Sequence, residues 1–215
     1  MHVFIVRHGE CLGNVDATLH PGPDTTLTPL GRTQARCAAK RLAGLGITHV
    51  VSSPLLRALS TAQTIAEEAT ITQITVCMDL REGNHGEYWC EPRSRLAAAA
   101  PTAILPAELG ESGWLHKTAD NGEFTLRCEH VIRWVKATFT HQDRVVLVTH
   151  GLVGSNLLHV LLGITWQRPT WFELANGSIT QVRLVRDPAA ERPGWELLPP
   201  VAVEVQVVND TRHLA

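Results

Sequence analysis

The stretch that decides the fold is the amino terminus, Met1-His-Val-Phe-Ile-Val-Arg-His-Gly-Glu10. Its apolar, β-branched run from Val3 to Val6 predicts a short buried strand. The run stops at Arg7 and His8, so both polar side chains belong to the carboxyl end of that strand. Open α/β sheets bind their ligands at this edge, which makes the Arg-His pair a candidate site.

Three more segments place polar residues where a predicted strand ends or a helix starts. They are Ser52-Ser-Pro-Leu-Leu-Arg57, Leu80-Arg-Glu82 and Val148-Thr-His-Gly151. Carboxyl ends of parallel strands share one edge of a sheet, so we expect these segments to gather around the first pair. The predicted pocket contains two arginines, two histidines and a glutamate, namely Arg7, Arg57, His8, His150 and Glu82.

Helical and strand patterns alternate along the chain. After the first strand, we expect strands over residues 47–51, 74–78, 144–149, 172–174, 178–186 and 201–208. We expect helices from Pro29, capped by Thr28, to a stop at Gly44 and Gly46; from Pro54, capped by Ser53; and over 124–139 and 152–162. This alternation predicts an α/β fold with a mainly parallel sheet, helices on both faces and an antiparallel edge.

The length of 215 residues suits a single α/β domain over residues 1–215. Residues 11–24 are rich in Gly, Pro and Asp and predict an irregular loop over the end of the first strand. Periodicity is lost over residues 88–121, which contain several prolines and an alanine run. We interpret 88–121 as a partly helical insertion that lies over the site as a lid.

Composition excludes several classes of protein. The net charge of -2 and a sequence pI near 6.6 give no overall attraction to nucleic acid or to an anionic membrane. The 5 cysteines lack C-x-x-C spacing, which argues against a disulfide framework or a zinc cluster, and most are expected in the core. Neither a secretory signal nor an apolar run of roughly 20 residues is present, so we expect a soluble cytoplasmic protein.

The predicted pocket suits phosphoryl transfer. A neutral imidazole of His8 can attack phosphorus and form a phosphohistidine. Arg7 and Arg57 would bind the phosphate oxygens through their planar guanidinium groups, and His150 would add a donor if protonated. Glu82 is the candidate proton donor to the leaving oxygen and then the base toward water. No metal or other cofactor is required, because arginines supply the positive charge.

These residues resemble the histidine phosphatase superfamily, also called the phosphoglycerate mutase-like family. The matching segments follow the order of the family along the chain: Arg7-His-Gly-Glu10, Asn14, Leu27-Thr-Pro-Leu-Gly31 with Gln34-Ala35, Ser52-Ser-Pro-Leu-Leu-Arg57-Ala58, Leu80-Arg-Glu82, Gly122-Glu123 with Arg127, and Val148-Thr-His-Gly151. The resemblance implies a three-layer α/β/α sandwich, a phosphohistidine at His8 and Glu82 as proton donor. It also implies phosphate contacts from Asn14, with Gly151 as a further binding candidate.

The sequence also departs from the family pattern. Phosphoglycerate mutases of the family usually follow the glutamate with Arg-His-Tyr-Gly, whereas Glu82 is followed here by Gly83-Asn-His-Gly86. This difference favours a phosphatase-type member. The stretch Asn84-His-Gly-Glu-Tyr-Trp-Cys90 is close to the phosphatase pattern but altered, so His85 and Tyr88 are candidates for shaping the substrate pocket.

The sequence therefore predicts a metal-independent phosphatase that hydrolyses a small phosphorylated metabolite. Two alternatives remain: a cofactor-dependent phosphoglycerate mutase, and a catalytically inactive module that binds a phosphate ligand. The physiological substrate is open, because the specificity segments are those with the least regular pattern. The chain is expected to be a monomer or a homodimer; strand 201–208 could pair within the chain or between copies.

Overall fold

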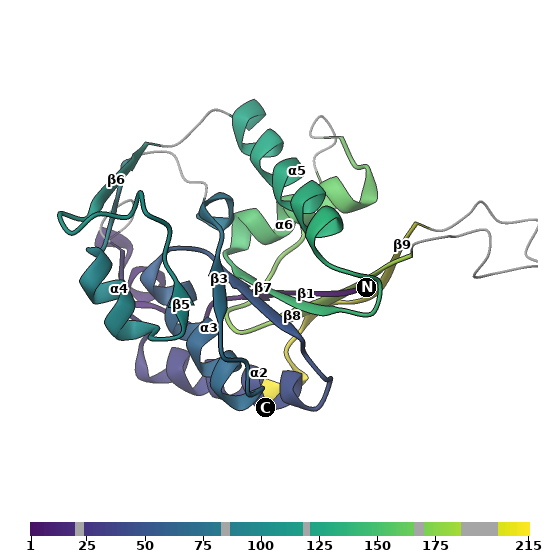
Figure 1. Ribbon diagram of the computed structural model, residues 1–215, viewed down its shortest axis with the longest axis horizontal. Coiled ribbons are helices and arrows are strands. Elements are labelled where there is room, and N and C mark those ends of the chain that lie inside the picture. Colours follow the sequence, from purple (N-terminus) through teal and green to yellow (C-terminus); the bar gives the residue numbers. More distant parts are fainter. Residues whose placement is uncertain (20–23, 83–86, 118–120, 166–169, 186–201) are drawn as a thin grey trace, which may run out of the picture.

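The computed structural model describes residues 1–19, 24–82, 87–117, 121–165, 170–185 and 202–215. A 7-stranded sheet in the order β5-β3-β2-β7-β1-β8-β9 forms its centre, as Figure 1 shows. The strands are β1 His2–Arg7, β2 His49–Ser52, β3 Ile74–Val76, β5 Ala103–Ile104, β7 Arg144–Thr149, β8 Ile179–Leu184 and β9 Val203–Asp210. The strands from β5 to β1 are parallel, and β8 and β9 add an antiparallel edge. The predicted α/β fold is confirmed.

Helices cover both faces of the sheet (Figure 1). Helices α2 Pro29–Ala43 and α3 Leu56–Glu68 pack on one face, and α5 Asn121–Thr138 and α6 Gly151–Leu162 pack on the other. Alternation along β1 separates the two cores, because Phe4 and Val6 contact the first pair of helices and Val3 and Ile5 contact the second. The result is a three-layer sandwich.

Two short helical segments follow β1 where a loop was predicted. Helix α1 spans Leu12–Val15 and a 3-10 turn spans Ala17–Leu19, so the prediction of a wholly irregular 11–24 was wrong. The side chain of Asn14 accepts hydrogen bonds from both the backbone N–H and the thiol of Cys11, which closes the first turn of α1. Polar residues such as Asn14 indicated a loop, but their side chains can also accept hydrogen bonds from the backbone at the start of a short helix.

Helix α2 begins as predicted. Thr28 Oγ1 accepts a hydrogen bond from Gly31 N at 3.0 Å, and Pro29 is the first helical residue. The predicted start of α3 was wrong, because the helix begins at Leu56 and not at Pro54. Ser53 Oγ instead accepts from Leu55 N at 3.2 Å, which stabilises the turn before the helix.

The insertion between β3 and α5 contains strands as well as a helix. Its elements are β4 Glu87–Cys90, α4 Arg93–Ala99, β5 Ala103–Ile104 and β6 Trp114–Lys117. Strands β4 and β6 form a separate antiparallel pair, whereas β5 extends the main sheet beside β3. Leu96, Ala100 and Leu109 pack with Leu56 and Leu59 of α3, so the insertion is anchored on α3.

The carboxyl part of the chain differs from the prediction in one element. No strand forms over residues 172–174; Leu174 is buried, and its carbonyl accepts a hydrogen bond from Arg7 Nη1. The carbonyl is therefore used by a side chain and not by a neighbouring strand. Strand β9 pairs with β8 of the same chain, which confirms the intramolecular alternative for this segment.

Three cysteines, Cys11, Cys90 and Cys128, are buried, and Cys37 and Cys77 are partly buried, as expected for residues of the core. Among the residues described, no helix is both long and apolar enough to cross a bilayer.

The start of α2 contacts the backbone of the segment that follows β1. A Cβ atom on Gly31 would lie 1.9 Å from Glu10 O, and one on Gly9 would lie 2.2 Å from Gly31 O. Thr28 N also donates to Glu10 O at 2.9 Å. This close approach fixes the Arg7–Glu10 segment against α2, and only glycine permits it at these positions.

We therefore predict that Gly31→Ala lowers the free energy of unfolding by about 1 to 3 kcal/mol, because the backbones must separate. Urea unfolding followed by circular dichroism measures this change. Gly44→Ala is the matched control, since Gly44 has φ −68° and no atom closer than 3.9 Å to the added Cβ. Equal stability of Gly31→Ala and the control would contradict the proposed close contact.

Candidate active site

The candidate site lies at the carboxyl edge of the three central strands. Parallel pairing of β7 with β1 and with β2 places Arg7 beside Thr149 and Ser52 beside Val148. Backbone hydrogen bonds continue this register one residue further, from His8 N to Thr149 O and from Ser53 N to Val148 O. His8, Ser53 and His150 are thus brought together from distant parts of the sequence.

His8 is buried, with 3 % of its surface exposed. Its Nδ1 lies 2.7 Å from Gly9 O, and a carbonyl oxygen only accepts, so Nδ1 carries the proton in this contact. Arg57 Nε donates to Nε2 at 3.3 Å, which requires a lone pair there. Burial lowers the pKa of His8 well below its usual range, and the charges of Arg57 and Arg7 lower it further. His8 is therefore neutral, with a nucleophilic Nε2.

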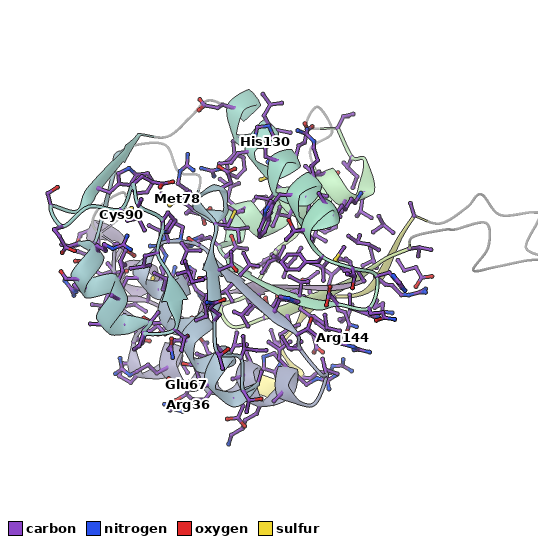
Figure 2. The ribbon with its side chains drawn as sticks, viewed as in Figure 1. Arg36, Glu67, Met78, Cys90, His130 and Arg144 are labelled. Carbon is purple, nitrogen blue, oxygen red and sulfur yellow. The ribbon has the colours of Figure 1, made fainter. Side chains whose placement is uncertain are left out.

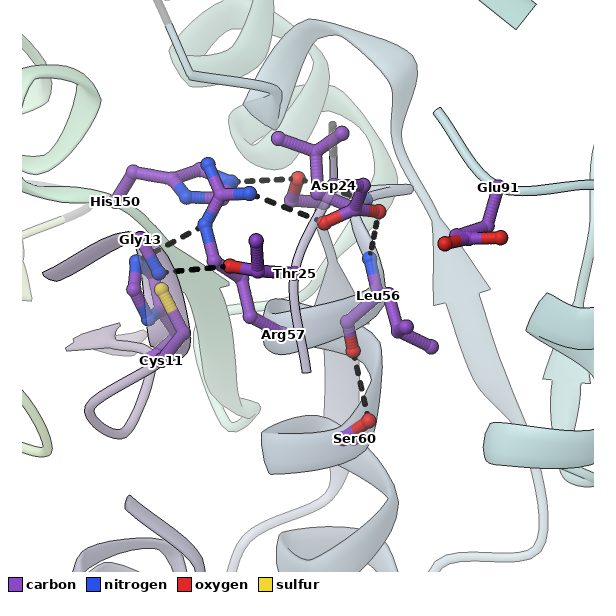
Figure 3. A network of polar contacts seen from close by, with 12 residues as sticks. Cys11, Gly13, Asp24, Thr25, Leu56, Arg57, Ser60, Glu91 and His150 are labelled. Atoms are coloured by element: carbon purple, nitrogen blue, oxygen red, sulfur yellow. Dashed lines mark hydrogen bonds and ion pairs between the residues drawn. The ribbon is translucent and has the colours of Figure 1, made fainter. Parts of the chain in front are cut away.

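Arg57 reaches His8 from the first turn of α3. Its guanidinium also donates from Nη1 to Asp24 Oδ1 at 3.0 Å, as Figure 3 shows. The second carboxylate oxygen of Asp24 accepts from Leu56 N, the first residue of the helix. Arg57 thus lies between a buried carboxylate and the reactive nitrogen of His8.

Arg7 is the last residue of β1 and is half-buried. It donates from Nη1 to Leu174 O at 2.6 Å. Burial lowers the pKa of its guanidinium, and the negative charge of Glu82 opposes this shift more than any other group. This influence of Glu82 on the pKa of Arg7 agrees with the predicted grouping of the two residues.

Glu82 comes shortly after the 3-10 turn Met78–Leu80. Hydrogen bonds to the carbonyl groups of the two residues before it fix this segment. Thr149 Oγ1, at the end of β7, donates to Leu80 O at 2.9 Å, and Arg127 Nη2, from α5, donates to Arg81 O at 2.9 Å. The half-buried Glu82 is therefore held between the central sheet and α5.

His150 is fully buried, and its ring centroid lies 5.0 Å from that of His8 in an edge-to-face arrangement. Burial lowers its pKa well below the usual range, and the charges of Arg57, His8 and Arg7 act in the same direction. From the sequence, His150 was expected to be a phosphate donor only if it is protonated, and the lowered pKa disfavours that protonated form. Its Nε2 contacts Ser53 Oγ at 2.8 Å, while its buried Nδ1 has no partner among the described residues.

Ser53 Oγ accepts from Leu55 N, and its hydroxyl hydrogen can donate to His150 Nε2. In that arrangement Nδ1 carries the proton. Neutral His150 then has an unused N–H donor that suits a phosphate oxygen.

Of the other predicted site residues, two lie near the cluster and two have side chains that the structure does not describe. Asn14 is exposed on α1 and accepts from Asn176 Nδ2, which also donates to His8 O. Gly151 begins α6, and a Cβ there would lie 3.5 Å from Arg7 Cζ, so the residue is next to the site. His85 lies outside the described residues, and so does the side chain of Tyr88, although its backbone pairs in β4.

Sequence reasoning did not identify Asp24, Ser53 or Asn176 as site residues. Asp24 is a carboxylate in a Gly- and Pro-rich segment, which resembles an ordinary solvated turn. Ser53 was interpreted as a helix cap. Asn176 precedes Gly177, whose φ of 74° is typical of a turn, and the sequence gives no sign of its contact with His8. These roles depend on contacts between distant segments.

No group of three or more potential metal ligands occurs within the part of the chain that the structure describes. The fold and this cluster define an α/β protein with a buried set of basic side chains suited to an anion. The chain belongs to the Histidine phosphatase superfamily (branch 1), whose sequence profile matches residues 3–191. This confirms the resemblance found in the sequence.

Similar proteins include both phosphatases and a mutase. The chain is 28 % identical over 214 residues to the probable phosphoglycerate mutase GpmB of Yersinia pestis (strain Pestoides F), covering 100 % of this chain and 95 % of the relative. Similar solved structures include a mycobacterial glucosyl-3-phosphoglycerate phosphatase complexed with VO3 (24 % identity, 97 % and 98 % coverage, TM-score 0.66). Another is a putative alpha-ribazole-5'-P phosphatase from Escherichia coli (22 % identity, 98 % and 97 % coverage, TM-score 0.67).

Proposed function

We propose that this member of the family is a metal-independent phosphatase that hydrolyses a small phosphorylated metabolite through a phosphohistidine. The observation that carries the proposal is the neutral His8, whose Nε2 lone pair faces the Arg57 guanidinium at 3.3 Å. Such a nitrogen is a nucleophile, and the adjacent cation attracts a phosphoryl oxygen to the place of attack.

In the first step, His8 Nε2 forms a bond to phosphorus as the bond from phosphorus to the ester oxygen breaks. Arg7, Arg57 and the Nδ1–H of His150 bind the phosphoryl oxygens, on which negative charge is spread. Glu82 gives a proton to the leaving oxygen, so the product departs as an alcohol. The hydrogen bond from Nδ1 to Gly9 O stabilises the positive charge that develops on the ring.

In the second step, water attacks the phosphohistidine. Glu82, now ionised, accepts a proton from that water, and the nitrogen–phosphorus bond breaks. The electron pair returns to Nε2, inorganic phosphate leaves, and the starting protonation state of Glu82 and His8 is restored. The sequence of steps needs neither a metal nor another cofactor.

Phosphoglycerate mutase activity is the second candidate, favoured by the similarity to GpmB over the full length of the chain. Against it stand Gly83 and His85, which replace the usual arginine and tyrosine after Glu82. A solved phosphoserine phosphatase from Entamoeba histolytica in complex with 3-phosphoglyceric acid has the same fold, at 20 % identity, 100 % and 99 % coverage and a TM-score of 0.63. Because the arginine and tyrosine that usually follow the glutamate are absent, we prefer the phosphatase assignment.

Further features of the proposal concern the whole chain. We propose one domain over residues 1–215, with 88–121 as a lid, Asn14 and Gly151 in phosphate binding, and His85 and Tyr88 in substrate selection. The partner is a small phosphate ester, and neither nucleic acid nor membrane is required. A cytoplasmic location and a monomeric or homodimeric state stay predictions.

The test of the proposed function is hydrolysis of an aryl phosphate in the presence of a chelator. His8→Ala is expected to lower kcat at least about 1,000-fold while the protein remains folded, because the nucleophile is lost. His130→Ala is the matched control, since this histidine is exposed on α5 (Figure 2) and is expected to leave turnover unchanged.

A panel of phosphorylated metabolites then ranks substrates. The phosphatase assignment would be overturned by faster interconversion of 2- and 3-phosphoglycerate than hydrolysis of any ester, or by full activity of His8→Ala.

A second prediction separates proton donation from general binding. Glu82→Gln is expected to lower kcat about 100-fold for an alkyl phosphate but less than about 10-fold for 4-nitrophenyl phosphate, when phosphorylation limits the rate. The reason is that an alkoxide needs a proton to leave, whereas nitrophenolate does not. Single-turnover kinetics with both esters measure the difference. An equal loss for the two esters would show that Glu82 does not protonate the leaving group.

A further inference from the structure

Asp24 is a buried carboxyl group that the proposed reaction does not use. Only 4 % of the residue is exposed. Its two oxygens accept hydrogen bonds from Arg57 Nη1 and from Leu56 N, so the carboxylate spans the first turn of α3 (Figure 3). The ion pair with Arg57 is buried on both sides, with side-chain exposures of 6 % for Arg57 and 0 % for Asp24.

The backbone around Asp24 is held against the segment that follows His8. Thr25 Oγ1 accepts from Gly13 N at 3.2 Å, and Thr26 O accepts from Leu12 N at 3.1 Å. One residue further, Leu27 forms a bridge with Cys11. Hydrogen bonds therefore hold the segment that carries Asp24 beside the segment that follows the proposed nucleophile.

The guanidinium of Arg57 donates hydrogen bonds to two neighbouring side chains. Nη1 donates to Asp24 and Nε donates to His8 Nε2, and its side chain makes no other hydrogen bond within the described residues. A guanidinium is planar and its donors keep fixed relative directions. Fixing Nη1 on the carboxylate therefore sets the plane of the group and the direction of Nε.

We propose that Asp24 is a positioning residue, whose carboxylate orients Arg57 so that this arginine aligns the phosphoryl group with His8 Nε2. This inference rests on the proposed function. Without the carboxylate, the guanidinium can rotate about its last bonds, and the phosphoryl group loses its in-line position. A displacement of about 1 Å from the reacting geometry can lower the rate by about 100-fold.

The electrostatic environment of Asp24 agrees with a functional role. Burial raises its pKa to about 6, while Arg57 and the N–H of Leu56 oppose the rise. Glu91, the residue after β4, raises the pKa of Asp24 further. A carboxyl kept in a site that disfavours its charge is typical of functional sites.

The test is a double-mutant cycle of Asp24 and Arg57. Asp24→Asn, which preserves size and removes the charge, is expected to lower kcat about 10- to 100-fold with KM changed less than about threefold. In the Arg57→Ala background the same substitution is expected to change kcat less than about twofold, because there is no guanidinium left to orient. Orthovanadate binding to the four proteins, measured by calorimetry, gives a second cycle that does not need turnover.

Asp143→Asn is the matched control. Asp143 also accepts a backbone N–H, from Thr140, and lies near a basic side chain, but it precedes β7 at the opposite edge of the sheet. It is expected to keep the kcat of the wild type. Asp24→Ser provides a second variant if Asp24→Asn does not fold, and circular dichroism verifies the fold of each protein.

Additive losses in the cycle, or full activity of folded Asp24→Asn or Asp24→Ser, would overturn the positioning role while leaving the proposed function intact. Failure of the wild type both to hydrolyse any ester and to bind vanadate would overturn both proposals together.

Discussion

The parallel pairing of β7 with β1 on one side and β2 on the other is the constraint on which the site depends. Each strand ends at the same edge, so His8, Ser53 and His150 meet although they are far apart in sequence. The close approach of Gly9 and Gly31 then fixes the segment after β1 against α2. A register shift of one residue would turn these side chains to the other face of the sheet.

Burial gives the assembled side chains their chemical properties. His8 and His150 are buried beside Arg57 and Arg7, and the pKa of each imidazole is lowered as a result. Lowered pKa values favour the neutral form of both rings, and a neutral imidazole has one N–H and one nitrogen lone pair. The guanidinium groups of Arg57 and Arg7 present planar sets of N–H donors beside the two rings, an arrangement suited to an anion with several acceptor oxygens.

Local patterns in the sequence predicted the α/β fold and most of its elements. Thr28 and Pro29 mark the start of α2, and the apolar run before Arg7 marks β1. The errors arise where tertiary contacts decide the structure. Leu174 looks like part of a strand but gives its carbonyl to Arg7, and the buried role of Asp24 depends on α3. The polar side chains at the ends of strands were predictable from the sequence, whereas the residues that contact and orient those side chains were not.

The central claim is that His8 carries the phosphoryl group during turnover. Rapid mixing with a substrate labelled in its phosphoryl group, followed by an alkaline quench that preserves phosphohistidine, tests it most directly. The account predicts that the label appears on Nε2 of His8 within the first turnover and is absent from His8→Ala. Label on another side chain, or rapid turnover with no labelled protein at any quench time, would contradict it.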